Sequence, residues 1–397
     1  MSFEFRTVEP DERAAWVRTA TAGFQHHRTE EEVAWVAEGL ARSVCRGAFE
    51  DGTMVATTEE YVTGLMLPGG VDVPTVAVTG VATVPSHRRR GAMRGLMERI
   101  LADARTAGID RVALWVADFR MYGRYGFASA APDYAQIEVD TAQGEFARPF
   151  TDPGGMRLVE PDEARRLLPG IYERARQGRP GDVLRHPDNW RYVLADKELA
   201  KKFVVIHADA EGNDDGYAVY EYQDKWEREV PLSVADCDDL VWCNGDAHAA
   251  LWRFLLDLDH LKTVRVWMRP LDDPIWWLLA NPRRARFALH DGLWIAVLDV
   301  PRALAARRYA SDGRLVLDVE GDRFLLESDG GEAACASTDR EPDLSLDRLT
   351  LAACHLGGHR FSTLAQAGLV RPLTGEALTR ADRLFMAECA PWCIGEF

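Results

Sequence analysis

The feature that most constrains the fold of this chain is an internal repeat. The segment RTVEPDER at residues 6–13 returns as RLVEPDEA at residues 157–164, at an offset of 151. A second pair of segments, RVALWV at 111–116 and TVRVWM at 263–268, has an offset of 152. Helix starts favour Pro, Asp and Glu, so the first match alone could arise by chance. Two matches at nearly one offset predict the duplication of a unit of about 150 residues.

The hydrophobic pattern supports this duplication and adds a third unit. Residues 1–140 predict the order β-α-α-β-β-β-α-β-α-β, with a capping box from Thr29 to Glu32 at the start of the second helix. A linker rich in Gly, Pro and Thr follows at 141–155. From residue 291, a hairpin, a further strand and terminal helices predict an α+β unit. We therefore expect an α+β protein with domains at 1–145, 146–290 and 291–397.

The composition of the 397 residues is typical of a globular protein, with 47% hydrophobic and 28% charged residues. No apolar run approaches the roughly 18 residues of a membrane span, and the acidic start has no apolar segment of a secretory signal. The seven Cys are odd in number and scattered, which favours reduced thiols and a cytoplasmic location. Cys389 and Cys393 have no matching pair nearby, and two glycines separate His355 from His359, so we expect no metal.

The charge of the chain points to the class of its ligand. The chain carries 47 basic and 63 acidic side chains, for a formal net charge of −16. Proteins that bind nucleic acid normally present a basic face, so we expect no nucleic-acid partner. A strong negative field suits cationic small molecules or basic peptides, although acidity can also serve solubility alone.

The sharpest local motif runs from Val84 to Arg94, with the sequence VPSHRRRGAMR. A β-branched strand leads into this basic turn, and an amphipathic helix follows it. The free N–H groups of a helix N-terminus beside arginine side chains form a site for a pyrophosphate. Gly91 would let the backbone approach a phosphate closely. The alternative is that Arg88, Arg89 and Arg90 are solvated surface charges, because basic runs are commonly exposed.

Two motifs resemble those of the GNAT superfamily of N-acetyltransferases. Arg88 to Ala92 is similar to their acetyl-CoA loop, Arg/Gln-x-x-Gly-x-Gly/Ala, although Met93 stands at the final small position. The segment YGRYGF at 122–127 resembles their Tyr-x-x-x-Gly-Phe motif. Over essentially its whole length the chain is similar to the Eis (enhanced intracellular survival) family, including the segment at 291–304 and the Trp-Cys-x-x-x-Phe ending.

This resemblance implies a fold and an activity together. It implies two tandem GNAT-like domains, of which only the first binds acetyl-CoA, followed by a sterol-carrier-protein-like domain, assembled as a homo-oligomer (a hexamer in this family). The implied reaction moves acetyl from acetyl-CoA, as co-substrate, to a primary amine of a cationic small molecule of the aminoglycoside or polyamine type. A lysine acetyltransferase that acts on proteins or peptides is one alternative. A non-catalytic lipid-binding or regulatory relic is the other.

The resemblance also assigns roles in the cofactor site. The Tyr122 hydroxyl would protonate the leaving thiolate, and a phenol with a pKa of about 10 suits that role. Tyr125 is the rival acid. The backbones of two strand residues would bind the pantetheine arm, and four loop residues would hold the pyrophosphate: Val81 and Thr83, then Arg88, Arg89, Gly91 and Ala92.

The attacking amine must lose a proton, because alkylammonium groups have a pKa of about 10. In the Eis family the base is the chain's own C-terminal carboxylate, which here belongs to Phe397, and Glu396 would add negative charge for a cationic amine. In most proteins a terminal carboxylate is a solvated, frayed end. We expect Trp392 and Phe397 to anchor this end in a pocket. Phe24 and Trp35 are candidate walls of the amine pocket, or plain core.

The second copy of the repeat lacks the phosphate loop. Near the position equivalent to Gly91 it reads Trp-Cys-Asn-Gly-Asp at 242–246, with no arginine, and Asp246 would repel a phosphate. We therefore expect one acetyl-CoA site per chain. We also expect the third domain to serve mainly by delivering the C-terminus to the first domain.

Overall fold

The computed structural model describes residues 3–395 and residue 397. In the first half of the chain, the predicted capping box is confirmed. Thr29 Oγ1 accepts the N–H of Glu32 at 3.2 Å, and the Glu32 carboxylate accepts the N–H of Thr29 at 2.9 Å. The elements of this half are β1 (Glu4–Thr7), α1 (Arg13–Gly23), α2 (Glu30–Gly39), β2 (Val44–Glu50), β3 (Thr53–Leu67), β4 (Val71–Thr83), α3 (Ala92–Thr106), β5 (Arg111–Leu114), α4 (Phe119–Tyr122) and β6 (Phe127–Asp140).

The second half repeats this order, as the duplicated segments predict. The repeated VEPDE segment ends β7 and begins α5, and the repeated TVRVWM segment lies in β13. The elements are β7 (Gly155–Val159), α5 (Pro161–Arg176), α6 (Pro187–Val193), α7 (Asp196–Leu199), β8 (Lys202–Ala208), β9 (Asp214–Gln223), β10 (Trp226–Glu227), β11 (Val230–Pro231), β12 (Ser233–Trp242), α8 (Gly245–Leu256), β13 (Leu261–Pro270), α9 (Ile275–Leu278) and β14 (Ala285–Val297).

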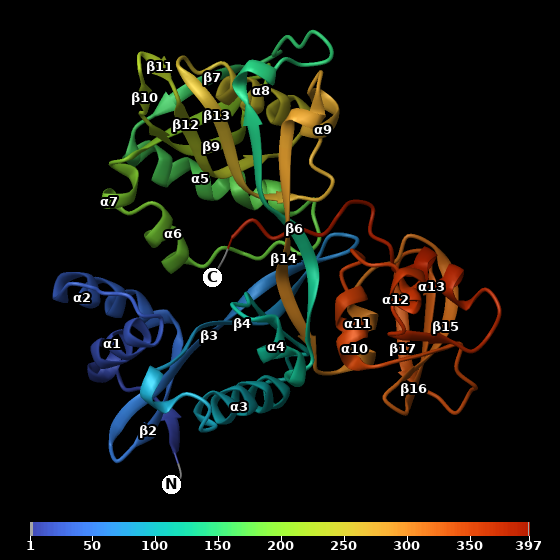
Figure 1. The fold of residues 1–397 in the computed structure, drawn as a ribbon. Helices are drawn as coiled ribbons and strands as arrows, with labels where there is room; N and C mark the ends of the chain where they lie inside the picture. The colour runs from blue at the N-terminus through green and yellow to red at the C-terminus, as the bar shows by residue number, and fades with distance from the viewer. Residues whose placement is uncertain (1–2, 396) are drawn as a thin grey trace.

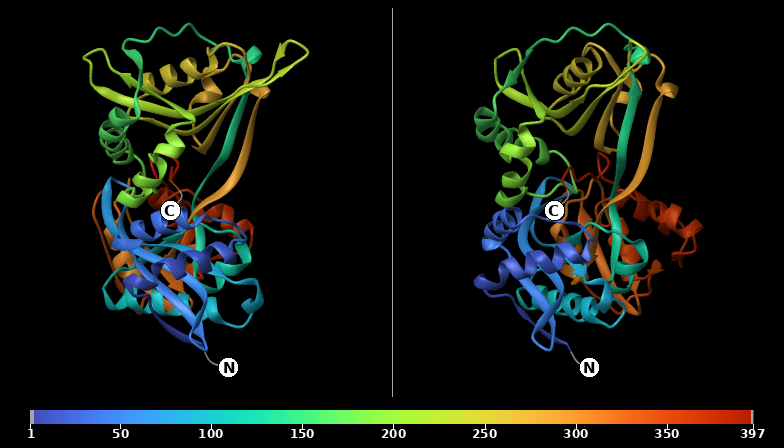
Figure 2. Two further views of the ribbon diagram at one scale, coloured as in Figure 1. Left: turned by 90° about the vertical axis from the view of Figure 1, so that its left-hand side faces the viewer. Right: turned by 60° about the vertical axis from the view of Figure 1, so that its left-hand side comes forward.

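Strands β6 and β14 join the two halves into one sheet. Residues 294–297 of β14 pair with β5 in the first half, and residues 133–140 of β6 pair with β13 in the second half. The two strands also pair with each other in both halves, and they run between the two halves as long neighbouring ribbons (Figures 1 and 2). Among the described residues the sheet has twelve strands, in the order β1-β2-β3-β4-β5-β14-β6-β13-β12-β9-β8-β7. Strand β14 spans the boundary predicted at 290, and the predicted domain limits stay predictions.

The third domain packs beside β6 and β14. Its sheet has the order β17-β16-β15-β18-β19, and its helix α11 contacts both shared strands. One buried cluster joins residues of the first half, such as Leu65 and Ala128, to residues of the third domain, such as Phe385. The elements are α10 (Val300–Ala306), β15 (Asp312–Val319), β16 (Asp322–Asp329), β17 (Ala333–Ser337), β18 (Leu344–Leu346), α11 (Arg348–Cys354), α12 (Phe361–Gln366), β19 (Val370–Pro372) and α13 (Ala377–Phe385).

After α13 the chain leaves the third domain and returns to the middle of the molecule. Figures 1 and 2 show the C-terminus between the first and second halves. Trp392 and Ile394 are buried there in a cluster of the second half. None of the described helices is both long and apolar enough to cross a bilayer.

Candidate active site

Strands β4 and β5 pair over a short stretch and then part. Residues 76–78 of β4 lie parallel to residues 112–114 of β5, and β5 ends there. Among the described strands, β4 continues to Thr83 alongside β3 alone. The far end of β4, with Val81 and Thr83, therefore presents a backbone edge to the gap, and such an edge can pair with an extended ligand. This is the edge that the sequence predicts for the pantetheine arm.

A β-bulge at Gly80 shapes this end of β4. The β3–β4 register shifts between Thr57 and Glu59, which places the extra residue on β4. Gly80 has a φ of +58°, and its carbonyl accepts a hydrogen bond from Thr57 Oγ1 at 2.9 Å. A Cβ atom at Gly80 would stand 2.6 Å from a ring carbon of Trp16. Gly80 was not predicted from the sequence, although a glycine inside a β-branched strand is the typical signal of a bulge.

Helix α3 begins with N–H groups that its own N-cap leaves free. The N-cap is Gly91 at a φ of +96°, with no side-chain cap and no acidic residue in the first turn. Arg89, two residues earlier, also has a positive φ of +63°. Among the described residues nothing lies within 4 Å of a Cβ atom built at Gly91, so the approach is open. Unpaired N–H groups at a helix N-terminus favour an anion such as a pyrophosphate.

Arg88 connects the loop before α3 to the end of α1. Its Nη2 donates to the carbonyl of Gly23 at 2.8 Å, and its Nε donates to the carbonyl of Thr83 at 3.4 Å. A Cβ atom at Gly23 would lie 2.7 Å from that of Ala82, so only glycine allows α1 to approach β4 this closely. Phe24 follows Gly23 directly and is 48% exposed. The structure therefore brings Phe24 and the cofactor loop together.

The other two loop arginines differ in their partners. Arg90 forms an ion pair with Glu50 and holds the pKa of that carboxyl below its usual value. His87 Nε2 lies 2.9 Å from the same carboxylate. Arg89 is exposed beside Gly91. Arg89 is thus the loop arginine whose charge is most available to an added anion.

Tyr122 is buried at the inner end of the gap. The residue is 5% exposed and belongs to the cluster that contains Val78 and Leu114, against which Val81 packs. Its ring contacts Phe127 edge to face, with centroids 6.2 Å apart. Burial raises the pKa of Tyr122 to about 12, so the hydroxyl holds its proton at neutral pH.

Two further residues of the motifs pack against the same cluster. Met93, which departs from the small residue of the acetyl-CoA loop pattern, packs against this cluster from the first turn of α3. Tyr125, the rival acid, also packs against it, and burial raises its pKa as well.

The last residue of the chain lies against the first half. The ring of Phe397 meets Tyr61 of β3 edge to face, with centroids 6.4 Å apart and planes at 72°. Tyr61 is opposite Ala77, one residue before the end of the β4–β5 ladder. The end of the chain therefore reaches the strand that borders the start of the gap. Glu396, which was predicted to add negative charge, lies outside the described residues.

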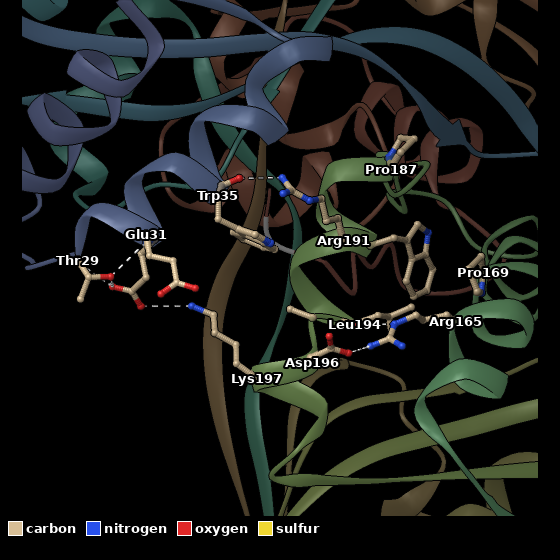
Figure 3. Close-up of a pocket in the computed structure, with 13 residues that line it drawn as sticks. Thr29, Glu31, Trp35, Arg165, Pro169, Pro187, Arg191, Leu194, Asp196 and Lys197 are labelled. Carbon is tan, nitrogen blue, oxygen red and sulfur yellow. Dashed lines mark hydrogen bonds and ion pairs between the residues drawn. The ribbon is translucent and has the colours of Figure 1, made fainter.

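A large pocket separates α2 from α5, α6 and α7. Its volume is about 950 Å³. At one side of it Arg191 Nη1 donates to the carbonyl of Trp35 of α2 at 2.8 Å, and Lys197 lies near the same residue (Figure 3). Trp35 was predicted for an amine pocket, but its partners from the second half were not, because no local motif marks them. The pocket is lined by Thr29, Glu31, Glu32, Trp35, Arg165, Pro169, Pro187, Trp190, Arg191, Leu194, Ala195, Asp196 and Lys197.

The second half closes the helix end that is open in the first. The Asn244 side chain caps α8 by accepting the N–H of Ala247 at 2.9 Å, and Asp246 stands in the first turn. The cap occupies one of the N–H groups that an anion would need, and the carboxylate repels an anion. This contrast with Gly91 supports the prediction of one acetyl-CoA site per chain.

The described part of the chain has no candidate metal site. Among these residues, no group of three or more His, Cys, Asp or Glu side chains could hold a metal ion. His355 is buried at the end of α11, and its Nε2 accepts from Arg111 Nε at 3.0 Å. The predicted acetyl-CoA site thus consists of backbone groups, arginines and a tyrosine.

Comparison with known families agrees with this geometry. Two different families, each described as acetyltransferase (GNAT) domain, match residues 4–130 and residues 181–294. The family described as sterol carrier protein domain matches residues 300–394. These matches confirm the predicted fold class, with two GNAT domains before a sterol carrier protein domain. GNAT acetyltransferases use acetyl-CoA.

Relatives of the whole chain narrow the family further. An uncharacterized N-acetyltransferase of Streptomyces griseus is 36% identical over 416 residues and covers 100% of both chains. N-acetyltransferase Eis of Mycobacterium tuberculosis is 36% identical over 350 residues, which are 84% of this chain and 83% of that protein. The crystal structure of Eis1 from Mycobacterium abscessus covers 99% of this chain and 100% of its own, with a TM-score of 0.87 and 29% identity. The fold, the two GNAT domains and these relatives together show that the chain belongs to the Eis family of GNAT N-acetyltransferases.

Proposed function

We propose that this N-acetyltransferase moves acetyl from acetyl-CoA to a primary amine of a cationic small molecule of the aminoglycoside or polyamine type. The observation that carries the proposal is the continuous path from the open edge of β4 to the uncapped start of α3. Val81 and Thr83 would pair with the pantetheine arm along this path. The N–H groups of Gly91 and Ala92, together with Arg89, would hold the pyrophosphate at its end.

Tyr122 is the proposed general acid. The amine nitrogen attacks the thioester carbonyl directly, a C–N bond forms, and the C–S bond breaks. Tyr122 gives its phenolic proton to the leaving sulfur, because a raised pKa keeps that proton available until the sulfur carries charge. Both Tyr122 and Tyr125 contact the cluster that Val81 packs against, and Tyr122 is preferred because of its position in the motif.

The carboxylate of Phe397 is the proposed general base. It accepts the proton that the attacking amine must lose. The contact between Phe397 and Tyr61 supports this role, because Tyr61 lies beside the start of the gap between β4 and β5. A carboxylate held in that place is near the base of the gap, where the acetyl group would lie.

The pocket at Trp35 supports a cationic acceptor. The guanidinium of Arg191 lies 4.3 Å from the centre of the Trp35 ring, and Lys197 Nζ lies 5.7 Å from it. Cations favour the face of an indole ring, and a substrate ammonium group could take the same position. Of the acidic side chains at this pocket, Glu32 is paired with Lys197 and Asp196 with Arg165, so Glu31 would supply the negative charge for a substrate ammonium group. We also propose that the chain assembles as a hexamer, as the family implies.

The test is thiol release from acetyl-CoA with three acceptors: tobramycin, spermidine and a lysine-containing peptide. We expect both free amines to release thiol at rates above the peptide. A preference for the peptide would favour the protein lysine acetyltransferase instead. Absence of thiol release with all three, together with no thermal stabilisation at saturating acetyl-CoA, would refute the proposal.

A further inference from the structure

The second half repeats the strand gap of the first half. Strand β12 pairs with β13 only at residues 233–237 and then continues to Trp242 alongside β9. The register against β9 shifts directly after Cys237, as the β3–β4 register shifts at Gly80. Strand β13 continues to Pro270 alongside β6. A cleft therefore lies between β12 and β13 at the position equivalent to the acetyl-CoA site.

Arg269 of β13 crosses this second cleft. Its Nη1 donates to the carbonyl of Leu240 on β12 at 2.7 Å, and its Nε donates to Asp273 at 3.0 Å. The Leu240 carbonyl belongs to the strand end that corresponds to the pantetheine edge of β4. The Arg269 side chain is buried, so it fills space that an acyl-CoA arm would need.

The C-terminal tail occupies part of the remaining cleft. The Trp392 ring stacks on Trp242, the last residue of β12, with centroids 5.5 Å apart and planes at 28°. Trp392 Nε1 donates to the carbonyl of Met268 on β13 at 2.9 Å. The guanidinium of Arg269 lies 4.9 Å from the centre of the Trp392 ring. A cavity of about 140 Å³, lined by Trp392 and Ile394 of the tail, remains beside them.

The loop before α6 holds the tail from the other side. The Trp392 N–H donates to the carbonyl of Pro180 at 2.8 Å, and the Ile394 N–H donates to Asp182 Oδ1 at 3.4 Å. A Cβ atom at Gly181 would stand 3.0 Å from the Trp392 nitrogen, so a glycine is needed for this contact. Asp182 is buried and also accepts the hydroxyl of Tyr172 at 2.9 Å.

The same loop is bonded to the strand that meets the chain end. The carbonyl of Asp182 accepts the N–H of Met66 on β3 at 2.9 Å. Tyr61, also on β3, contacts Phe397. Phe397 is three positions after Ile394, so the two lie at most about 10 Å apart. Fixing Trp392 and Ile394 in the cleft therefore limits where the terminal carboxylate can lie.

We propose that the second GNAT domain uses its cofactor cleft as a dock for the chain's own C-terminal tail. Trp392, Arg269 and Asp182 are then positioning residues for the Phe397 carboxylate. This inference rests on the proposed function, in which that carboxylate is the base. In the first domain this cleft would hold acetyl-CoA. In the second domain the equivalent cleft would instead hold the tail and so position the carboxylate for the reaction.

The experiment measures docking and catalysis separately in the full chain. Docking is measured by native alkylation of Cys393, which is fully buried in the tail, with N-ethylmaleimide and peptide mass spectrometry. Cys237, fully buried in the same domain, reports any general unfolding. Catalysis is measured as kcat and KM with acetyl-CoA and tobramycin. The variants are Trp392→Ala, Trp392→Phe and Asp182→Asn, with Leu255→Ala as a core control.

We expect Trp392→Ala to make Cys393 reactive while Cys237 stays protected. We also expect kcat to fall by about 10²-fold, the cost of a base displaced by roughly 1 Å, while KM for acetyl-CoA stays unchanged. Trp392→Phe keeps the ring and should retain most of the activity. The kcat of Asp182→Asn should lie between those of Trp392→Ala and Trp392→Phe. Leu255→Ala, which opens a cavity in a different buried cluster, should lower Tm and leave kcat and Cys393 unchanged.

Two results would overturn the inference. Protection of Cys393 in Trp392→Ala would show that the cleft does not hold the tail. A reactive Cys393 with an unchanged kcat would show that docking does not position the base. Deletion of Phe397 separates this inference from the proposed function. An unchanged rate in that variant would refute both the role of the Phe397 carboxylate as base and the role of the positioning residues. The protection of Cys393 would still show whether the tail docks in the cleft.

Discussion

The guanidinium of Arg88 donates to the main-chain carbonyl of Gly23 at 2.8 Å, and this contact joins the loop before α3 to the end of α1. Phe24, a predicted wall of the amine pocket, is the next residue after Gly23. One side chain therefore links the predicted cofactor loop to the predicted acceptor wall. A substitution at Arg88 should affect both the cofactor loop and the acceptor wall, whereas one at Arg89 should affect the cofactor loop alone.

Arg89→Ala should raise KM for acetyl-CoA and leave KM for the amine unchanged. A lost charge-assisted contact to phosphate is worth about 1.5–3 kcal/mol, which corresponds to roughly 10–150-fold. Arg88→Ala should raise both KM values, because it also releases Gly23. Arg120→Ala, an exposed arginine on α4, is the matched control and should change neither. Steady-state kinetics with both substrates varied decide the matter, and an unchanged acetyl-CoA KM in Arg89→Ala contradicts the assignment.

Gly80→Ala should damage the open end of β4. The new Cβ atom forces a non-glycine residue to a φ of +58° and meets Trp16 at 2.6 Å. We expect a loss of stability of about 1–3 kcal/mol and a higher KM for acetyl-CoA. Gly52→Ala, at a φ of +77° with nothing described within 4 Å, carries the backbone strain alone. Thermal melts should show the larger loss for Gly80→Ala. Equal melts and equal KM values would contradict the role of the bulge.

Tyr122→Phe should lower kcat by about 10²–10⁴-fold, because it removes only the proton that the leaving sulfur needs. KM for acetyl-CoA should stay unchanged, since the ring still fills its place in the cluster around Val78. Tyr125→Phe is the matched control and should retain most of the wild-type rate. If the two variants exchange these outcomes, Tyr125 is the acid.

The pH dependence of kcat should lack a descending alkaline limb from the acid. Burial disfavours the phenolate and raises the pKa of Tyr122 to about 12, so Tyr122 stays protonated as the pH rises. The rate should instead rise toward the pKa of the acceptor amine, about 10, as the free amine accumulates. A rate profile from about pH 6 to 10.5 tests this. A descending limb that is present in wild type and absent from Tyr122→Phe would contradict the raised pKa.

Deletion of Phe397 should cut kcat severely. The deletion leaves a carboxylate about 3.5 Å short of its position, and a general base must lie within hydrogen-bond reach of the amine. A short Gly-Ser extension after Phe397 should act in the same way, because it converts the carboxylate into an amide. Acetyl-CoA affinity should remain, since the loop at 88–92 is untouched. Melting temperatures recorded alongside exclude unfolding as the cause. A tagged protein with the untagged rate would show that another group is the base.

The local features of the fold could be predicted from the sequence. The capping box at Thr29 and the basic turn before α3 depend on neighbouring residues, and short-range preferences determine them. The duplication was visible because two segments kept similar residues at one offset. The loop motif and Tyr122 were predicted because each belongs to a short run of residues that resembles a motif of the GNAT superfamily.

The remaining features depend on contacts between distant residues. Trp294 of β14 pairs with Leu114 of β5 across 180 positions of the chain, and no local pattern identifies such a partner. Two contacts of the site are of the same kind. Arg88 donates to the carbonyl of Gly23, and Arg191 lies against the ring of Trp35, and in each case the partners are far apart in the sequence. The bulge at Gly80 had a local signal, a glycine within a β-branched strand, that went unused.

The two strands shared between the halves also set the order of events during synthesis. Strands β5 and β6 are complete by residue 140, yet β14, which lies between them, ends only at residue 297. At the usual rates of translation the ribosome needs roughly 10–30 s to make the intervening chain. During that time the nascent first half has two unsealed strand edges, which are templates for aggregation. The first half therefore completes its strand pairing only after β14 has been made.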